Sequence, residues 1–514
     1  MIPYSTSDLW AISPMLAIVI TAMTVLMIDL ALPRDRKSLL VFVSFLGAII
    51  SGACIASLWD KGVTGFNGTV VADDFALLLQ GILLVVIVIS VALSERYIQT
   101  KGINYGEYYA LMLFSASGAM LMATSRELIT IFVGLEVLSI ALYVLSGFAR
   151  TEARSEESAM KYFLLGAFSS GFFLYGIALT YGGMHTTRLD EMVTNFRSVP
   201  AAVNLTYAVA GASLLIVGLG FKAAIVPFHS WTPDVYEGAP TSVTAFMSAG
   251  AKVGAFAAFI RIIVTLLPIF HMLEPVLWLL AVLTMIVGNV IALKQTNIKR
   301  MLAYSSIAHA GYILVGLIAN NADGHAAIMF YVLTYTFMNL GAFGIIIMLA
   351  RRGQEVNNIS DLYGLGERHP GVAVLMTIFM LSLAGIPPAA GFIGKFFLFY
   401  AAVEAHQYAL AVIGLLASVV GVVYYLYVII GMWFRPASRE YPANVWGFGP
   451  LADAAVVISA IATLGLGVFF SGLHLISEKG AASLDAPIVR MAGLPNAVPV
   501  QAVPVHASTL ASVR

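Results

Sequence analysis

Four charged residues stand alone inside long apolar runs of the sequence: Glu136, Lys222, Lys252 and Lys395. A charged side chain near the centre of a bilayer costs roughly 2.5–3.5 kcal/mol even on the most permissive insertion scale, so residues of this kind usually have a task. A lysine that is removed from water holds its proton less firmly and can take one up and release it. The chemistry that this pattern favours is proton transfer inside a membrane.

Glu136 and Lys222 are the two members of this set with opposite charges. A carboxylate and an ammonium group within about 4–6 Å each hold the other in its charged form, so moving them apart changes the proton affinity of both. We therefore expect Glu136 and Lys222 to form a proton switch. The alternative is a static ion pair that only joins two helices.

Lys252 is the twelfth residue of an apolar run at 241–266, and no acidic residue at the same depth remains to pair with it. Its central position favours a lysine that binds and releases a proton. The alternative is a side chain that reaches back to the membrane surface. The same two readings apply to Lys395.

Two histidines also fall at membrane depth, His309 and His229. An imidazole can relay protons because its two nitrogens donate and accept in turn, but a lone histidine can equally be a satisfied core residue. Asp234 and Glu237 are expected to cap helices or bind neighbouring backbone. Arg261 is expected to extend toward the outer surface of the membrane.

The elements that position these residues are membrane spans. Hydrophobic residues make up 60% of the 514 residues and charged residues 11%, with a mean hydropathy of +0.92, too apolar for a soluble domain. Runs of spanning length predict an all-α, polytopic membrane protein of about fourteen helices. They lie at 10–31, 38–58, 76–94, 108–124, 127–149, 160–182, 207–226, 241–266, 272–293, 301–319, 326–349, 371–404, 408–434 and 452–474.

Other classes of protein receive no support from the sequence. The net charge is zero, so no basic surface for nucleic acid is indicated. The one cysteine, Cys54, cannot form an internal disulfide or a four-cysteine iron–sulfur site. No glycine-rich or Walker motif for nucleotides appears. We expect no cofactor and no metal on this chain.

Two of the spans are predicted to be broken. The seventh contains Lys222 followed by Pro227, which lacks a backbone donor and interrupts a helix. The twelfth, at 371–404, would be about 51 Å long as one helix, much more than the roughly 30 Å of a hydrocarbon core. Pro387 and Pro388 lie within it, just before Lys395. A buried lysine beside irregular backbone is typical of a polar path through a membrane protein.

The order of the helices predicts two inverted repeats. Spans four to eight (residues 108–266) and nine to thirteen (267–434) each have a broken, lysine-bearing fourth member. Because five is odd, the second set enters the membrane from the opposite side, as in many transporters. The remaining segments are a three-helix segment at 1–107, the last span within 435–476 and a loose external tail at 477–514.

The loops predict the orientation. Placing the N-terminus outside leaves sixteen Lys and Arg residues in inner loops and seven in outer loops and the tail. This split fits the excess of basic residues on the cytoplasmic side, so both termini are expected outside. The N-terminal residues lack the features of a cleaved signal peptide, and the first apolar run is expected to remain as a span.

Three segments carry a family resemblance: GLEVLSIALYVL, FKAAIVPFHSWTPDVYEGAPTSVTAFMSAGAKVG and LAGIPPAAGFIGKF. They resemble the antiporter-like, proton-pumping subunits of respiratory complex I, and the resemblance extends over residues 1–475. Within that group, the VPFHSWTPDVYEGAPT segment and the lysine of the twelfth span favour the N-type subunits of NADH-quinone oxidoreductase.

This resemblance implies roles for the buried residues and a place in a complex of the bacterial inner membrane. Glu136 and Lys222 would form the modulating pair, Lys252 the central proton carrier and Lys395 part of the outer half-channel. Proton movement would be coupled to NADH oxidation and quinone reduction. NADH, FMN, the iron–sulfur clusters and quinone would be bound by partner subunits, so this chain would contribute to a translocase without a redox centre.

Two alternatives of other classes stay open. The first is a subunit of a multisubunit cation/proton antiporter, against which the buried lysines argue because they repel cations. The second is a scaffold subunit of a membrane hydrogenase or oxidoreductase, which would not need three buried lysines.

Overall fold

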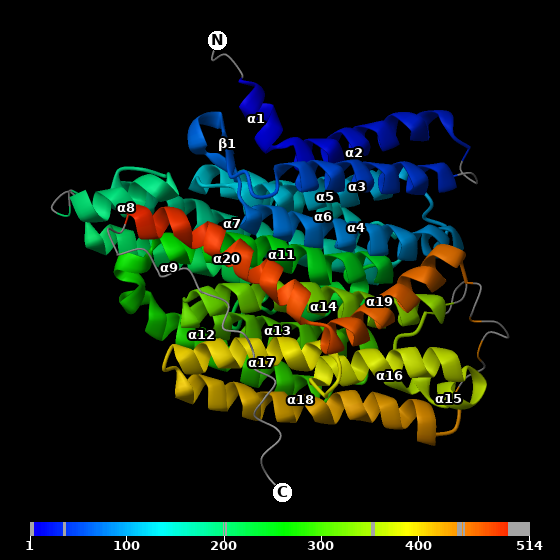
Figure 1. The fold of residues 1–514 in the computed structure, drawn as a ribbon. Coiled ribbons are helices and arrows are strands. Elements are labelled where there is room, and N and C mark those ends of the chain that lie inside the picture. Colours follow the sequence, from blue (N-terminus) through cyan, green and yellow to red (C-terminus); the bar gives the residue numbers. More distant parts are fainter. Residues whose placement is uncertain are drawn as a thin grey trace, which may run out of the picture.

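The computed structural model is a bundle of helices that run roughly parallel to one another (Figure 1). It describes residues 5–33, 37–198, 200, 203–350, 355–438, 441, 445 and 448–491. The first half contains α1 (Thr6–Ala11), α2 (Ser13–Ala31), α3 (Ser38–Leu58), α4 (Asp74–Lys101), α5 (Gly106–Thr124), α6 (Leu128–Ser146), α7 (Ala153–Met184), α8 (Leu189–Ser198), α9 (Leu205–Ala223) and α10 (Trp231–Gly238). The second contains α11 (Thr241–Thr265), α12 (Phe270–Ala292), α13 (Ile298–Ala319), α14 (Ala322–Met348), α15 (Leu365–Arg368), α16 (Pro370–Ala384), α17 (Ala390–Glu404), α18 (Tyr408–Phe434), α19 (Pro450–Val468) and α20 (Ser471–Met491).

The fold is not purely helical. Two short strands, β1 (Val63–Gly65) and β2 (Val70–Ala72), pair in an antiparallel hairpin between α3 and α4. Short 3₁₀ turns complete the described elements: η1 (Phe66–Gly68), η3 (Leu267–Ile269) and η4 (Ile359–Leu362). The hairpin lies in a connection outside the apolar runs, where backbone groups can pair with each other or with water.

Twelve of the described helices are long and apolar enough to cross a membrane, against about fourteen predicted spans. Two of the predicted spans are not among these twelve helices, for different reasons. The predicted span at 108–124 is α5, a helix of 19 residues that is not among the twelve. It carries serines and is enclosed by α2, α4, α6 and α11, so it needs less apolar surface. The predicted span at 371–404 consists of two shorter helices, α16 and α17.

Both predicted helix breaks are present. The chain leaves α9 at Ala224, which has a left-handed φ of 62°, and becomes helical again in α10. It leaves α16 at Gly385, with a φ of 83°, and resumes in α17. Glycine is the residue that adopts this conformation most readily at a helix end. Lys222 therefore lies in the last turn before one break, and Lys395 lies in the second turn after the other.

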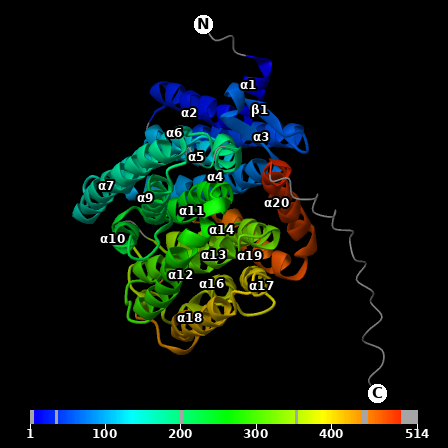
Figure 2. The same ribbon diagram turned by 90° about the vertical axis from the view of Figure 1, so that its left-hand side faces the viewer.

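Helix α11, which carries Lys252, lies at the centre of the bundle. The span that it forms is 100% buried, and its neighbours α13 and α14 are 94% and 89% buried. Seen end-on, α11 and α14 lie inside a ring formed by the other helices (Figure 2). Large apolar side chains are exposed instead along α3, α6, α7 and α18, as expected of helices that face lipid or neighbouring subunits.

Arg261 does not extend to the surface of the membrane, as its position near the end of a span had suggested. Its side chain is 3% exposed and forms a bidentate ion pair with Asp73, with N–O distances of 2.6 and 3.0 Å. Its Nε donates to the carbonyl of Ala123 at 2.6 Å. The guanidinium group therefore joins α4, α5 and α11 at one end of the bundle, because Asp73 caps the start of α4.

The C-terminal region is also more ordered than predicted. Helix α20 continues through Ser477 to Met491, so the expected boundary between 476 and 477 falls inside a helix. α20 crosses the bundle obliquely (Figure 1) and contacts α14 and α4. The hydroxyl of Ser483 accepts a bond of 3.0 Å from the backbone of Phe75. The prediction of a loose tail was therefore wrong for residues 477–491. Residues 492–514 lie outside the described part of the chain.

Candidate functional site

Glu136 on α6 and Lys222 on α9 do not touch, and α7 packs against both of these helices. Glu136 lies on α6, is half-buried and accepts a hydrogen bond from the hydroxyl of Ser170 on α7. Lys222 is 3% exposed, and its Nζ donates to the hydroxyl of Tyr162 at 2.9 Å. No ion pair within 4.0 Å joins the two charges. The two groups are thus hydrogen-bonded separately, and their action as a pair stays a prediction.

A narrow cavity lies beside both groups. It is lined by Lys222, Tyr143 and three serines, Ser139, Ser169 and Ser170. Its volume of about 10 Å³ is enough for about one water molecule. Because Ser170 also binds Glu136, a proton could pass between the two charges through hydroxyl groups and one water.

The geometry of the break after Lys222 is fixed by aromatic packing. The ring of Tyr162 stacks on Trp231, with centroids 4.4 Å apart and planes at 9°. The indole of Trp231 donates to the carbonyl of Phe221 at 2.9 Å. α10 is thereby attached to the last turn of α9, and the tyrosine that binds Lys222 is held in one orientation.

Lys252 is buried between three helices. Its Nζ donates to the backbone carbonyl of Ser306 on α13 and lies 5.7 Å from the centre of the Tyr335 ring on α14. The hydroxyl of Tyr335 donates to the side chain of Ser306 at 2.9 Å. No acidic side chain pairs with Lys252 among the described residues, in agreement with the sequence reading.

His309 is 1% exposed and is held between tyrosines. Its Nδ1 bonds to the hydroxyl of Tyr331, and its Nε2 lies 3.1 Å from the hydroxyl of Tyr425. The imidazole ring is 5.1 Å from the ring of Tyr335, which neighbours Lys252. Both ring nitrogens thus have partners that can donate and accept a hydrogen bond. A proton relay needs such partners, but a histidine with a purely structural role in the core has them too.

Lys395 is held by the free carbonyl groups at the second break. Its Nζ donates to the carbonyls of Leu383 and Ala384 at 3.0 Å and to the hydroxyl of Ser418 at 2.9 Å. It lies 4.9 Å from the centre of the Tyr312 ring, and that ring is 5.7 Å from the imidazole of His309. The break therefore supplies acceptors that a continuous helix would use in its own hydrogen bonds.

Tyrosine hydroxyls and one asparagine form a hydrogen-bond network beside His309 and Lys395. Asn289 donates to the hydroxyl of Tyr312 at 2.9 Å and accepts from the hydroxyl of Tyr424 at 3.1 Å. The sequence reading missed these residues. Tyrosines within apolar spans and an asparagine in α12 were the available signal, but tyrosine is too common in membrane helices to be singled out.

His229 does not lie among the buried lysines and His309. It lies in the turn between α9 and α10, is half-buried and has an Nδ1 with no protein hydrogen-bond partner. The described contacts connect it to none of the buried lysines.

Asp234 and Glu237 form ion pairs instead of capping helices. Asp234 binds Lys161 at 2.7 Å and Arg300 at 2.6 Å, and Glu237 binds Arg300 at 3.1 Å. Burial opposes the charge of Asp234, but the hydrogen bonds from Lys161 and Arg300 outweigh it and lower the pKa of this carboxyl. These pairs attach α10 to α7 and α13, where the sequence had indicated only backbone contacts.

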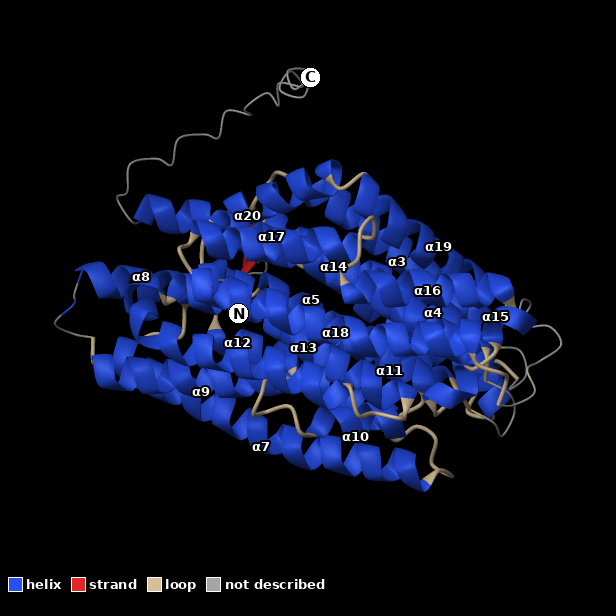
Figure 3. Ribbon diagram, turned by 90° about the horizontal axis from the view of Figure 1, so that it is seen from below, coloured by secondary structure: helices blue, strands red, loops and turns tan. Residues whose placement is uncertain are grey.

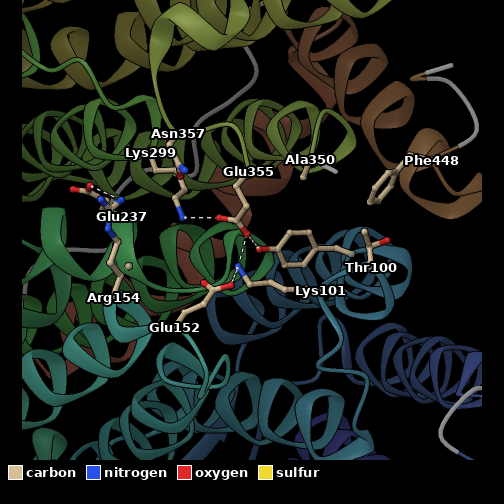
Figure 4. A pocket seen from close by; sticks show the side chains of 12 residues that line it. Thr100, Lys101, Glu152, Arg154, Glu237, Lys299, Ala350, Glu355, Asn357 and Phe448 are labelled. Atoms are coloured by element: carbon tan, nitrogen blue, oxygen red, sulfur yellow. Dashed lines mark hydrogen bonds and ion pairs between the residues drawn. The ribbon is translucent and has the colours of Figure 1, made fainter. Parts of the chain in front are cut away.

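A second cluster of charges, which the sequence reading also missed, surrounds a cavity of about 240 Å³ (Figure 4). Glu355 lies at its centre and binds Lys101 and the hydroxyl of Tyr97, the latter at 2.6 Å. Lys299 lies 3.8 Å from the same carboxylate, and Glu152 lies 3.0 Å from Lys101. Charged residues are common in loops and at helix ends, so nothing in the sequence indicated that these residues lie together.

Comparisons with known proteins define the class. The family model described as NADH:quinone oxidoreductase/Mrp antiporter, TM matches residues 125–421. The fold resembles a chain of respiratory complex I from Thermus thermophilus with bound aureothin, with a TM-score of 0.77, 34% identity and coverage of 90% of this chain and 98% of that one. A chain of the Mrp complex from Dietzia sp. has a TM-score of 0.78 at 21% identity, covering 95% and 99%, which shows the shared fold. The chain is an antiporter-like membrane subunit.

Curated relatives identify the branch. The chain is 47% identical to NADH-quinone oxidoreductase subunit N of Trichlorobacter lovleyi over 459 residues, 89% of this chain and 94% of the relative. It is 43% identical to the same subunit of Chloroflexus aggregans over 476 residues, 92% and 97% of the two chains. The chain belongs to the family of subunit N of NADH-quinone oxidoreductase.

Proposed function

We propose that this chain, as subunit N of a proton-translocating NADH:quinone oxidoreductase, carries protons along a row of buried groups. The proposal rests on the burial and the neutral surroundings of three lysines and one histidine. Lys222, Lys252 and Lys395 are all nearly inaccessible to solvent, and none of the three has an acidic side chain in contact. His309 and its tyrosines lie between the last two lysines.

Glu136 and Lys222 act at the start of the row as a switch. When a water in the cavity beside Ser170 connects them, the carboxylate stabilises the charged lysine. When Glu136 is neutralised or moves, Lys222 loses this support and releases its proton. This charge change then acts on Lys252 through the low-dielectric interior.

Lys252 passes its proton toward His309, and His309 passes it toward Lys395. The hydroxyls of Tyr335, Tyr331 and Tyr425 surround the imidazole and supply the intervening donors and acceptors. Lys395 then releases the proton at the outer side. His229 lies outside this row, and we assign it no step.

The electron-transfer chemistry belongs to other subunits of the complex. NADH, FMN, the iron–sulfur clusters and quinone bind there, and this chain supplies only proton movement. Within the described residues, no group of three His, Cys, Asp or Glu side chains is arranged to hold a metal ion. The exposed apolar faces of α3, α6, α7 and α18 contact lipid or neighbouring membrane subunits.

The chain crosses the bacterial inner membrane with both termini outside. Fourteen spans result when α5 and the α16–α17 pair are counted with the twelve long helices. Residues 108–266 and 267–434 then form two inverted halves. The position of the breaks supports this, since one follows Lys222 and the other precedes Lys395.

A cation/proton antiporter receives less support than the proton pump. Sodium prefers a cage of oxygen ligands, whereas the buried row consists mainly of lysines. The likeness to the Mrp complex concerns the fold alone, at 21% identity.

The switch is tested by Glu136→Gln, which keeps the shape and hydrogen bonding but removes the charge. In assembled complexes in membrane vesicles, we expect NADH-driven pumping and quinone reduction to fall together by about tenfold or more, the loss typical of a removed proton-transfer group. Glu156→Gln, at an exposed position on α7, is the control and keeps both activities. Normal pumping by the Glu136 variant would reduce the pair to a structural contact.

A further inference from the structure

One residue that lines the charged cavity of Figure 4, Tyr97, contacts the helix that carries Lys252. Tyr97 at its floor is 2% exposed, and its hydroxyl donates to Glu355 at 2.6 Å. The same hydroxyl accepts a bond of 3.0 Å from the backbone N–H of Thr241, the first residue of α11. A polar connection therefore runs from the cavity to the start of α11 without passing Lys222.

A second set of hydrogen-bonded hydroxyl groups begins at the next residue of α11, Ser242, and lies one turn deeper on α4. Ser94 on α4 lies 3.1 Å from the hydroxyl of Tyr108, which lies 2.7 Å from the hydroxyl of Ser242 on α11. All three side chains are fully buried. Ser94 in turn donates to the backbone carbonyl of Ser90 at 2.6 Å, so hydrogen-bonded groups lead from Ser242 to the next turn of α4.

A further turn inward, α4 presents a hydroxyl group without a protein partner, and α11 presents Ser248, which donates to the carbonyl of Ala245 at 2.7 Å. α4 and α11 pack in opposite directions, since Tyr97 meets Thr241 and Val86 lies beside Gly250. This register places Ser90 at about the depth of Ser248. The hydroxyl of Ser90 is buried and has no hydrogen-bond partner in the protein.

The third helix at this depth is α14. The amide nitrogen of Asn339 donates to the hydroxyl of Ser248, while its Oδ1 is buried and has no protein partner. Ser248 lies one turn before Lys252 on α11, and Asn339 lies one turn after Tyr335 on α14. The unpartnered atoms are thus at a depth about one helical turn from the central lysine.

We propose that protons reach Lys252 from the charged cavity along this polar track between α4, α11 and α14, with ordered water bound by Ser90, Ser248 and Asn339. Residues that only joined the helices would satisfy one another, whereas buried polar atoms without protein partners usually bind ordered water. In the transfer step, an O–H bond of a protonated water breaks, and its proton forms the third N–H bond on the neutral Lys252 amine, which becomes an ammonium group while a neutral water remains. The track rests on the proposed role of Lys252 as a carrier.

The test replaces the amide by an apolar side chain of similar size, Asn339→Leu. In assembled complexes in inverted vesicles, NADH-driven pumping should fall by about tenfold or more, because the water loses its main ligand. Asn339→Ser, which keeps a hydroxyl and leaves room for water, should restore most of it. The control is Thr336→Val on the same helix, where the buried hydroxyl bonds only to its own helix at the carbonyl of Val332.

A second readout does not depend on activity. In a Cys54→Ala background, Ser248→Cys should react with a small water-soluble thiol reagent added to the inner face. Ser44→Cys, at an equally buried serine of α3, should not react. An unreactive Ser248→Cys, or normal pumping by Asn339→Leu, overturns the track. Normal pumping by Lys252→Met instead removes the carrier, and with it the proposed function.

Discussion

At the scale of single residues, the buried lysines share one feature: their hydrogen-bond acceptors are neutral. Lys222 binds a phenol, Lys252 a backbone carbonyl, and Lys395 two carbonyls and a hydroxyl. Neutral acceptors support the ammonium group without fixing its charge as a carboxylate would. Lys101 is the contrast, because it forms an ion pair with the carboxylate of Glu355.

The sequence predicted these lysines but not their partners. A charge within an apolar run is conspicuous in the sequence, so Lys252 and Lys395 were found directly. Backbone carbonyls at a helix break have no sequence signal of their own. Asn339 and Ser248 were missed because a single amide or hydroxyl in a membrane helix usually bonds to its own backbone.

Glu355 yields a prediction about pH. Burial opposes its charge, but Lys299 and Lys101, with hydrogen bonds from Lys101 and Tyr97, lower its pKa from 4.5 to about 2. A lowered pKa stabilises the folded protein above about pH 4.5, and this contribution is lost as the pH falls toward 2. Between pH 5 and 8 the carboxylate remains charged.

Glu355→Gln should therefore destabilise the assembled complex by a similar amount throughout pH 5 to 8. Removing one partner of a buried ion pair costs about 3–5 kcal/mol, and the partial exposure of Glu355, 23%, reduces this to roughly 1–3 kcal/mol. The measurement is the dissociation temperature of purified complex at several pH values, against Glu156→Gln. A penalty that disappears between pH 7 and 5 would show that Glu355 titrates in that range.

At the scale of elements, the two breaks position the lysines. α9 ends one residue after Lys222, and α16 ends with the carbonyls that bind Lys395. The sequence predicted both breaks because proline and glycine interrupt helices. It missed α20, which mixes apolar and polar residues and contacts α14 and α4 (Figure 3 shows it beside α17).

The proposed orientation of these elements predicts a labelling pattern. In a Cys54→Ala background, Thr151→Cys before α7 should be protected from an impermeant thiol reagent added outside intact cells. Thr194→Cys on α8 should react, because α8 lies at the opposite end of the bundle (Figure 1). Permeabilised cells, in which both exposed positions should react, provide the control. The reverse pattern would overturn the orientation and the inversion of the two halves.

At the scale of the whole molecule, the proposed mechanism has two routes that converge on Lys252. One comes from Glu136 and Lys222, and the other comes from the cavity around Glu355. Beyond Lys252 the row continues to His309 and Lys395. In this arrangement Lys222 sets the charge next to the carrier, while the cavity supplies the proton. Lys252 is therefore the residue on which pumping depends most directly.

The decisive measurement compares Lys252→Arg with Lys252→Met in assembled complexes reconstituted into vesicles. Arginine keeps the positive charge but does not release its proton in proteins, because its guanidinium group stays protonated above about pH 12. If Lys252 carries the proton, NADH-driven acidification of the vesicle interior, normalised to assembled complex, should fall about as far in the arginine variant as in the methionine variant. Near-normal acidification with arginine would show that only the charge at this position matters, and would remove Lys252 from the proton path.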